Sequence, residues 1–159
     1  MTDRALADRL LACLDLTSLG DDDPPGRIAA LCDAATTPRG PVAAVCVYPE
    51  HVQACRARLG AGPVRVATVV NFPDGSADSG RARREVRRAL AVGAQEIDVV
   101  FPWRALLEGD ATAGARLVAA CRAAMPAEAT LKVILESGGR DWDHRETGAQ
   151  VARVAGAGF

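Results

Sequence analysis

The sequence has 159 residues, of which 49% are hydrophobic and 25% are charged, and its formal net charge is −1. This composition is typical of one soluble globular domain, so we expect a single domain over residues 1–159. The chain has no excess of positive charge with which to bind nucleic acid or an anionic membrane surface, so neither is expected as a partner. The locally basic segment Arg81–Arg88 is interpreted as the solvent-exposed face of a helix.

The cysteines and the N-terminal segment indicate the cellular compartment in which the protein is expected. Five cysteines are present, they form no C-x-x-C pair, and they fit reduced thiols in a cytosolic protein. The first residues, MTDRALADRLLAC, form an amphipathic pattern with acidic residues and have no apolar core like that of a signal peptide. No apolar run approaches the ~18 residues that a membrane span needs. We therefore expect a soluble, cytoplasmic protein.

Helical and strand-like segments alternate along the chain. A first helix is predicted at about 3–13, and a second over DDDPPGRIAALCDAA, where Asp and Pro residues occupy the favourable N-terminal end. Short apolar runs rich in β-branched residues predict strands at 42–48, 64–72, 96–101 and 130–136. Helical patterns follow at about 50–59, 77–92, 104–124 and 143–155. This alternation predicts an α/β fold with a parallel sheet covered by helices.

Two architectures share this pattern, an open doubly wound sheet and a (β/α)8 barrel. The length favours the open sheet, because a full barrel has about 250 residues and this chain holds about five βα units. However, neither G-x-G-x-x-G nor G-x-x-x-x-G-K-[ST], the phosphate loops of nucleotide-binding open sheets, is present. The apolar end AGAGF resembles the entry into a further strand.

Two charged residues lie inside predicted strands. Asp98 is flanked by Ile97 and Val99, and Lys132, the only lysine of the sequence, lies between apolar neighbours in the next strand. Charged side chains are rarely buried unless they are paired or functional. If the two strands are neighbours, the acid and the amine meet inside a barrel or at a sheet edge. The pair is then either a structural ion pair or an amine and a proton-transferring carboxylate of carbonyl chemistry.

Further polar groups are candidates for the same site. Asp15 and Asn71 lie at the ends of two more strands, and barrel enzymes gather catalytic residues at strand ends. Cys46 projects from a strand and is either a residue of the site or an inert buried thiol. Glu136 follows Lys132 closely and is either an active-site partner or a surface residue at the end of its strand.

Metal binding is not expected from the sequence. The two histidines, His51 and His144, are isolated in helical segments without cysteine or carboxylate at ligand spacing. The three consecutive acidic residues Asp21, Asp22 and Asp23 are interpreted as a helix start and not as a metal cluster.

Five consecutive motifs of the sequence resemble strand motifs of the deoxyribose-phosphate aldolases, in the same order. They are LDLTSL (14–19), AAVCVYP (43–49), RVATVVNFPDG (65–75), EIDVVFPWRAL (96–106) and LKVILESG (131–138). The resemblance implies a (β/α)8 barrel and a metal-independent class I aldolase without a cofactor. It further implies reversible cleavage of 2-deoxy-D-ribose 5-phosphate, a phosphosugar, into acetaldehyde and D-glyceraldehyde 3-phosphate.

The resemblance also implies roles for individual residues. Asp98 matches the catalytic proton donor and acceptor, Lys132 matches an auxiliary lysine that tunes the reactive amine, and Asp15 supports them. Cys46, Asn71 and Glu136 are expected in the substrate pocket.

The Schiff-base lysine of the resembled family would lie just beyond Phe159. The chain would therefore be the first five or so βα units of an incomplete barrel, inactive alone or completed as a homo-oligomer. The alternatives are a non-catalytic barrel fragment and an open-sheet domain that binds a small molecule.

Overall fold

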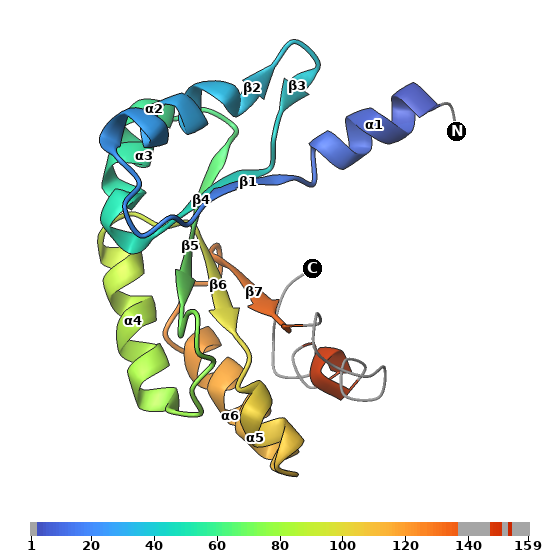
Figure 1. The fold of residues 1–159 in the computed structure, drawn as a ribbon, viewed down its shortest axis with the longest axis vertical. Coiled ribbons are helices and arrows are strands. Elements are labelled where there is room, and N and C mark those ends of the chain that lie inside the picture. Colours follow the sequence, from blue (N-terminus) through green and yellow to red (C-terminus); the bar gives the residue numbers. More distant parts are fainter. Residues whose placement is uncertain (1–2, 137–146, 151–152, 154–159) are drawn as a thin grey trace. The chain divides into compact units, whose positions relative to one another are not determined.

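The computed structural model describes residues 3–136, 147–150 and 153. The chain divides into two compact units, Met1–Thr68 with Val92–Gln95, and Val69–Ala91 with Glu96–Phe159. Each unit is described by itself (Figure 1). The single domain expected over residues 1–159 stays a prediction.

The first unit contains parallel strands and two packed helices. The strands β1, β4 and β5 pair in parallel, with Asp15 opposite Ala44 and Ala44 opposite Arg65. Helices α2 and α3 contact each other and bury small and branched side chains, among them Cys32 and Cys55. The elements are α1 (Asp3–Leu11), β1 (Asp15–Ser18), α2 (Pro25–Ala34), β2 (Thr36–Thr37), β3 (Gly40–Pro41), β4 (Ala44–Val47), a 3-10 turn (Pro49–His51), α3 (Val52–Leu59) and β5 (Arg65–Val70).

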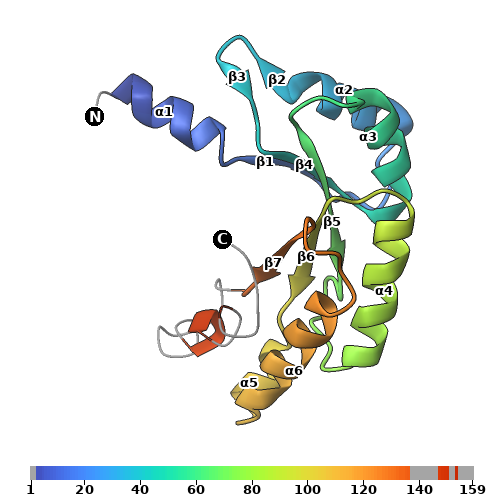
Figure 2. The same ribbon diagram turned by 180° about the vertical axis from the view of Figure 1, so that it is seen from behind.

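A short antiparallel hairpin follows α2 and was not predicted. Its strands β2 and β3 have two residues each, and the Thr37 hydroxyl donates to the Gly40 carbonyl at 2.8 Å. Arg39, in the turn, donates to the Asp8 carboxylate of α1 at 2.6 and 2.9 Å, which links this helix to the hairpin. Figure 2 shows the backbone of α1 and of the hairpin β2–β3 from behind. Strands this short carry no alternation of apolar and polar residues, so a pattern search does not detect them.

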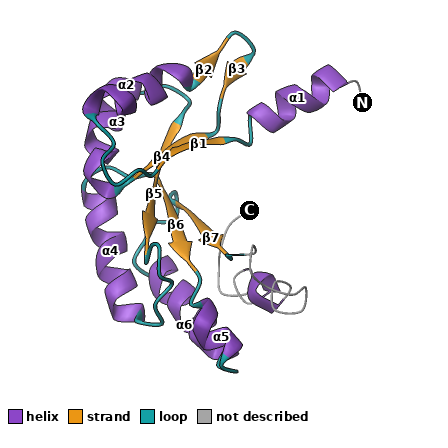
Figure 3. Ribbon diagram, in the orientation of Figure 1, coloured by secondary structure: helices purple, strands orange, loops and turns teal. Residues whose placement is uncertain are grey.

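The second unit is built on a pair of parallel strands. Strands β6 and β7 run side by side in the same direction (Figure 3), with Asp98 opposite Lys132 and Val100 opposite Ile134. Helix α4 buries Ala82, Val86 and Ala89 and contacts α6, while its arginines 83, 84, 87 and 88 are exposed as expected. The elements are α4 (Ser79–Ala91), β6 (Glu96–Val100), α5 (Trp103–Leu107), α6 (Ala111–Arg122) and β7 (Thr130–Ile134).

The single helix predicted at 104–124 is wrong, because two helices occupy this segment. Gly109 has a φ of 93°, which glycine adopts without a steric penalty and which ends the first helix. Asp110 then caps α6 by accepting from the backbone N–H groups of Thr112 and Ala113. Hydrogen bonds from Thr112 and Arg116 lower the pKa of the Asp110 carboxyl to about 2. Of the helix predicted at 143–155, residues 147–150 and 153 are helical, and the remainder, His144 included, lies outside the described residues.

The strand order decides between the two predicted architectures. Strand β5 runs from the first unit into the second, and the five parallel strands follow the order β1-β4-β5-β6-β7. A doubly wound sheet reverses its strand order at a switch point, whereas this order advances in one direction, as in a barrel. Among the described residues, none of the helices has the length and the apolar character that a membrane span requires.

A close contact in the second unit yields a stability prediction. A Cβ at Gly114 of α6 would lie 2.1 Å from Cζ of Phe101, whose ring is fully buried. Gly114→Ala should therefore destabilise the protein. Overpacking of a core costs about 1–3 kcal/mol, whereas replacing glycine by alanine inside a helix stabilises it by at most about 1 kcal/mol. The free energy of unfolding in urea is the measurement.

The matched control for this change is Gly26→Ala in α2, where a Cβ would meet no atom within 4 Å. This variant should be as stable as the parent or slightly more stable. Equal stability of the two alanine variants would contradict the proposed clash with Phe101.

Candidate functional site

The strand pairing places Asp98 and Lys132 directly opposite each other. The Lys132 ammonium Nζ lies 3.0 Å from Oδ1 of Asp98 and donates a hydrogen bond to Oδ2 at 3.3 Å. Both residues lie in the middle of their strands, two residues before the carboxyl ends. The two strands are neighbours, which was the condition for the acid to meet the amine.

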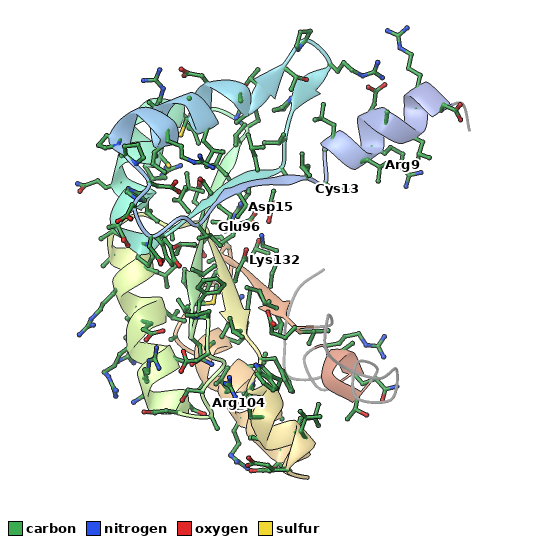
Figure 4. The ribbon with its side chains drawn as sticks, in the orientation of Figure 1. Arg9, Cys13, Asp15, Glu96, Arg104 and Lys132 are labelled. Atoms are coloured by element: carbon green, nitrogen blue, oxygen red, sulfur yellow. The ribbon has the colours of Figure 1, made fainter. Side chains whose placement is uncertain are left out.

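A second carboxylate, not singled out from the sequence, completes this cluster. Oε2 of Glu96 lies 3.1 Å from Nζ of Lys132, and Figure 4 shows the two side chains pointing toward each other. Glu96 precedes Asp98 by two residues in β6, so the alternation of side chains along a strand puts both on one face. The same alternation could have identified Glu96 from the sequence. We call Glu96, Asp98 and Lys132 the strand cluster.

The strand cluster is partly shielded from water. The side chains of Glu96 and Asp98 are 10% and 13% exposed, and that of Lys132 is 30% exposed. Two carboxylates at ion-pair distance favour the charged form of the ammonium. A charged ammonium has no lone pair with which to attack a carbonyl carbon. The geometry therefore fits Lys132 as a fixed cation better than as a nucleophile, and it places a shielded carboxylate beside that cation.

Asn71 organises the loop that follows β5. Its side chain is fully buried and donates from Nδ2 to the carbonyl oxygens of Ser76, at 2.8 Å, and Val100, at 2.9 Å. Its backbone N–H donates to Oε2 of Glu85 at 2.7 Å, and its φ of 55° is one that asparagine tolerates. Asn71 thus fixes this loop to the end of β6, two residues after Asp98. A contact with substrate stays a prediction for this residue.

The other predicted site residues are placed individually. Glu136 is exposed, lies two residues after the end of β7 and has a φ of 52°. Asp15 is half-buried and is the first residue of β1, while Cys46 is 3% exposed in β4, opposite Thr17 and Ala67. Asp15 and Cys46 belong to the first unit, and the strand cluster belongs to the second. Participation of these three residues in one site stays a prediction.

Cys55 and Cys121 are among the buried cysteines of the described residues. Burial raises the pKa of Cys55 and of Cys121 to about 12, so both remain protonated at neutral pH. Within the described part of the chain, no three His, Cys, Asp or Glu side chains are grouped so as to hold a metal ion. Asp23 lies just before α2, where the Ser18 hydroxyl donates to its carboxylate and lowers its pKa.

A pocket of about 630 Å³ lies between α2 and α3 in the first unit. Its walls are mostly small or apolar, and its polar rim includes Arg58, whose guanidinium is paired with Asp33 at 2.6 Å. None of the predicted site residues lines it. The strand cluster, where shielded opposite charges meet, is therefore the better candidate for chemistry.

Comparison with known families agrees with the strand motifs and the strand order. A family model described as DeoC/LacD family aldolase matches residues 10–157. The chain belongs to this family. The sequence resemblance to aldolases is thereby confirmed, together with the barrel-type α/β fold.

Solved structures of aldolases match almost the whole chain. A protein from Coccidioides immitis assigned as a deoxyribose-phosphate aldolase has 30% identity and a TM-score of 0.86, over 94% of this chain and 58% of that one. A Toxoplasma gondii protein with the same assignment has 26% identity and a TM-score of 0.84, over 96% and 59%. The tetrameric deoxyribose phosphate aldolase of Aeropyrum pernix has 25% identity and a TM-score of 0.75, over 94% and 62%. This chain spans less than two thirds of the length of each.

Proposed function

We propose that the strand cluster is part of the active site of a class I aldolase. The substrate is 2-deoxy-D-ribose 5-phosphate, which is cleaved reversibly to acetaldehyde and D-glyceraldehyde 3-phosphate in deoxyribose phosphate catabolism. The observation that carries the proposal is the Asp98–Lys132 pair, 3.0 Å apart on adjacent strands of a DeoC/LacD family chain. The assignments of the solved relatives support the choice of substrate.

Asp98 is the proton donor and acceptor in this proposal. Imine formation and carbon–carbon cleavage both require protons to be delivered and removed, through water or directly. A carboxylate that is 13% exposed and adjacent to a cation is suited to this exchange, since it is largely shielded from bulk water but still accessible to a water molecule or to substrate. Asp15 assists it, Asn71 fixes the adjoining loop, and Cys46 and Glu136 remain candidates for the substrate pocket.

Lys132 is the auxiliary cation and not the Schiff-base nucleophile. Its ammonium is held by two carboxylates, and it is the only lysine of these 159 residues. The nucleophilic lysine is therefore a residue outside these 159, and we expect the isolated chain to form no imine. The tetramer of the Aeropyrum pernix relative supports a homo-oligomer as the working assembly.

The proposal can be tested with a chimaera. In this protein, the present chain is fused to the part of the Aeropyrum pernix aldolase that has no counterpart in the present chain. We expect the chimaera to cleave 2-deoxy-D-ribose 5-phosphate and to trap acetaldehyde with borohydride on a lysine of the archaeal part. The isolated chain should show no adduct on Lys132 by mass spectrometry. The intact archaeal enzyme is the control.

Two results would overturn the proposal. An adduct on Lys132 would reverse the assigned roles. A chimaera that folds cooperatively, as judged by circular dichroism and a single thermal transition, but cleaves nothing would favour the alternative of a non-catalytic scaffold.

A further inference from the structure

Glu85 is the only acidic residue of the basic segment Arg81–Arg88, and it lies apart from the exposed arginines of that segment. Its side chain is 29% exposed, and its Oε1 pairs with Nε of Arg81, one turn earlier in α4, at 2.7 Å. Burial and, after it, the Glu85 carboxylate raise the pKa of Cys121 in α6 to about 12, so this carboxylate lies near the face of α4 that contacts α6. An ion pair within one helix accounts for Oε1 but not for the position of Oε2.

The second oxygen of Glu85 binds the loop that follows β5. Oε2 accepts a hydrogen bond from the backbone N–H of Asn71 at 2.7 Å, and Asn71 is fully buried. A hydrogen bond to a carboxylate is roughly twice as strong as one between neutral groups. Arg81 reaches the same loop, because its Nη1 lies 3.3 Å from Oδ2 of Asp74. Helix α4 thus holds residues 71–76, which we call the β5 loop, at two points.

The β5 loop packs on the end of β6, the strand that carries Asp98. Nδ2 of Asn71 donates to the carbonyl oxygen of Val100 at 2.9 Å, and the side chain of Val100 lies on the same strand face as that of Asp98. A Cβ at Gly75 would lie 2.6 Å from the carbonyl oxygen of Phe101, so the two backbones approach closely there. A shift of the β5 loop therefore either displaces the end of β6 or admits water beside it.

We propose that Glu85 is a positioning residue of the aldolase reaction, which holds the β5 loop on the end of β6 through the N–H of Asn71. Glu85 touches no reacting group in this role, and it fixes the surroundings of Asp98 through the loop. Catalysis is sensitive to such support, because a displacement of about 1 Å caused far from the reacting atoms can lower a rate about 100-fold. The inference rests on the proposed function, whereas the anchoring of Asn71 is a property of the unliganded chain.

Two substitutions separate this role from that of an ion pair within α4. Glu85→Gln keeps an oxygen that accepts the Asn71 N–H, but it removes the charge that pairs with Arg81. Glu85→Met has a side chain of similar length and removes both the acceptor and the charge. If the ion pair alone mattered, the two variants would behave alike. If the acceptor matters, glutamine should rescue what methionine loses.

The first measurement is amide hydrogen exchange in the isolated chain, followed by NMR. We expect the N–H of Asn71 to exchange at least about tenfold faster in Glu85→Met than in the parent, and within about threefold of the parent in Glu85→Gln. The reference is the N–H of Phe101, which donates to the carbonyl oxygen of Ile134 at 2.9 Å in the same unit and should accelerate far less. Equal acceleration at both amides would indicate general destabilisation and would overturn the proposal.

The second measurement is kcat in the chimaera, at a temperature at which circular dichroism shows every variant to be fully folded. Glu85→Met should lower kcat about tenfold or more, and Glu85→Gln should stay within about threefold of the parent. The matched control is Glu108→Met, at an exposed glutamate after α5, which should stay within about twofold. A purely structural glutamate would lower the stability of the fold and leave kcat of the folded enzyme unchanged, and that result would overturn the proposal.

The two measurements also separate this inference from the proposed function. A parent chimaera that cleaves nothing would reject the aldolase function, while faster exchange at Asn71 alone would still establish Glu85 as the anchor of the β5 loop. An active chimaera in which Glu85→Met keeps the parent kcat would instead reject the positioning role of Glu85 and leave the aldolase function standing.

Discussion

Asp98→Asn in the active chimaera should lower kcat by about 100-fold or more, while KM changes little. A positioned general acid and base contributes roughly 10²–10⁴-fold to a rate. Asparagine retains the shape of the side chain but exchanges no proton. The fold should survive, because Glu96 still holds Lys132 at 3.1 Å. Steady-state rates of acetaldehyde release from 2-deoxy-D-ribose 5-phosphate are the measurement.

The matched control for Asp98 is an aspartate of the surface. Asp33, whose side chain is 60% exposed, belongs to the first unit and pairs with Arg58 at the end of α2. Asp33→Asn should leave kcat within about twofold, because exposed ion pairs contribute little. A similar loss of kcat in both variants would show that removal of any carboxylate lowers the rate, and would contradict a specific proton transfer by Asp98.

Four of the strands, β4, β5, β6 and β7, were predictable from local patterns. Alternation within a strand fixes the face on which a side chain lies, whereas the pairing of Asp98 with Lys132 depends on which strands are neighbours, and a local pattern does not fix this. The choice between barrel and open sheet was not local, because both architectures have the same alternation of elements. It depended on the strand order, which involves residues distant in sequence.

The errors of the sequence-based prediction have specific physical causes. The break between α5 and α6 depends on one glycine with a positive φ and on one aspartate cap, Gly109 and Asp110, within an otherwise helical pattern. Glu96 lies at the first position of β6, where an acidic residue is usually solvated. Here it is buried and lies 3.1 Å from Lys132 of β7, the only lysine of the sequence.

Lys132→Met should lower the free energy of unfolding by about 2 kcal/mol or more. Methionine fills much of the same space, but it removes the ammonium and leaves Glu96 and Asp98 as two like charges on one strand face. Loss of one partner from a buried ion pair costs about 3–5 kcal/mol, and the 30% exposure of the lysine side chain reduces this cost. Urea unfolding followed by circular dichroism at neutral pH is the measurement.

Neutralising the two carboxylates shows whether Lys132→Met loses stability through unpaired charge or through poorer packing. Lys132→Met combined with Glu96→Gln and Asp98→Asn should recover most of the stability, since the two carboxylates that face the lysine are then uncharged. Arg83→Met on the exposed face of α4 is the control for loss of a surface cation and should be nearly neutral. A triple variant as unstable as Lys132→Met would mean that the aliphatic stem of Lys132 stabilises the sheet by packing. A rescued triple variant would instead show that Lys132 stabilises the sheet by neutralising these two acids.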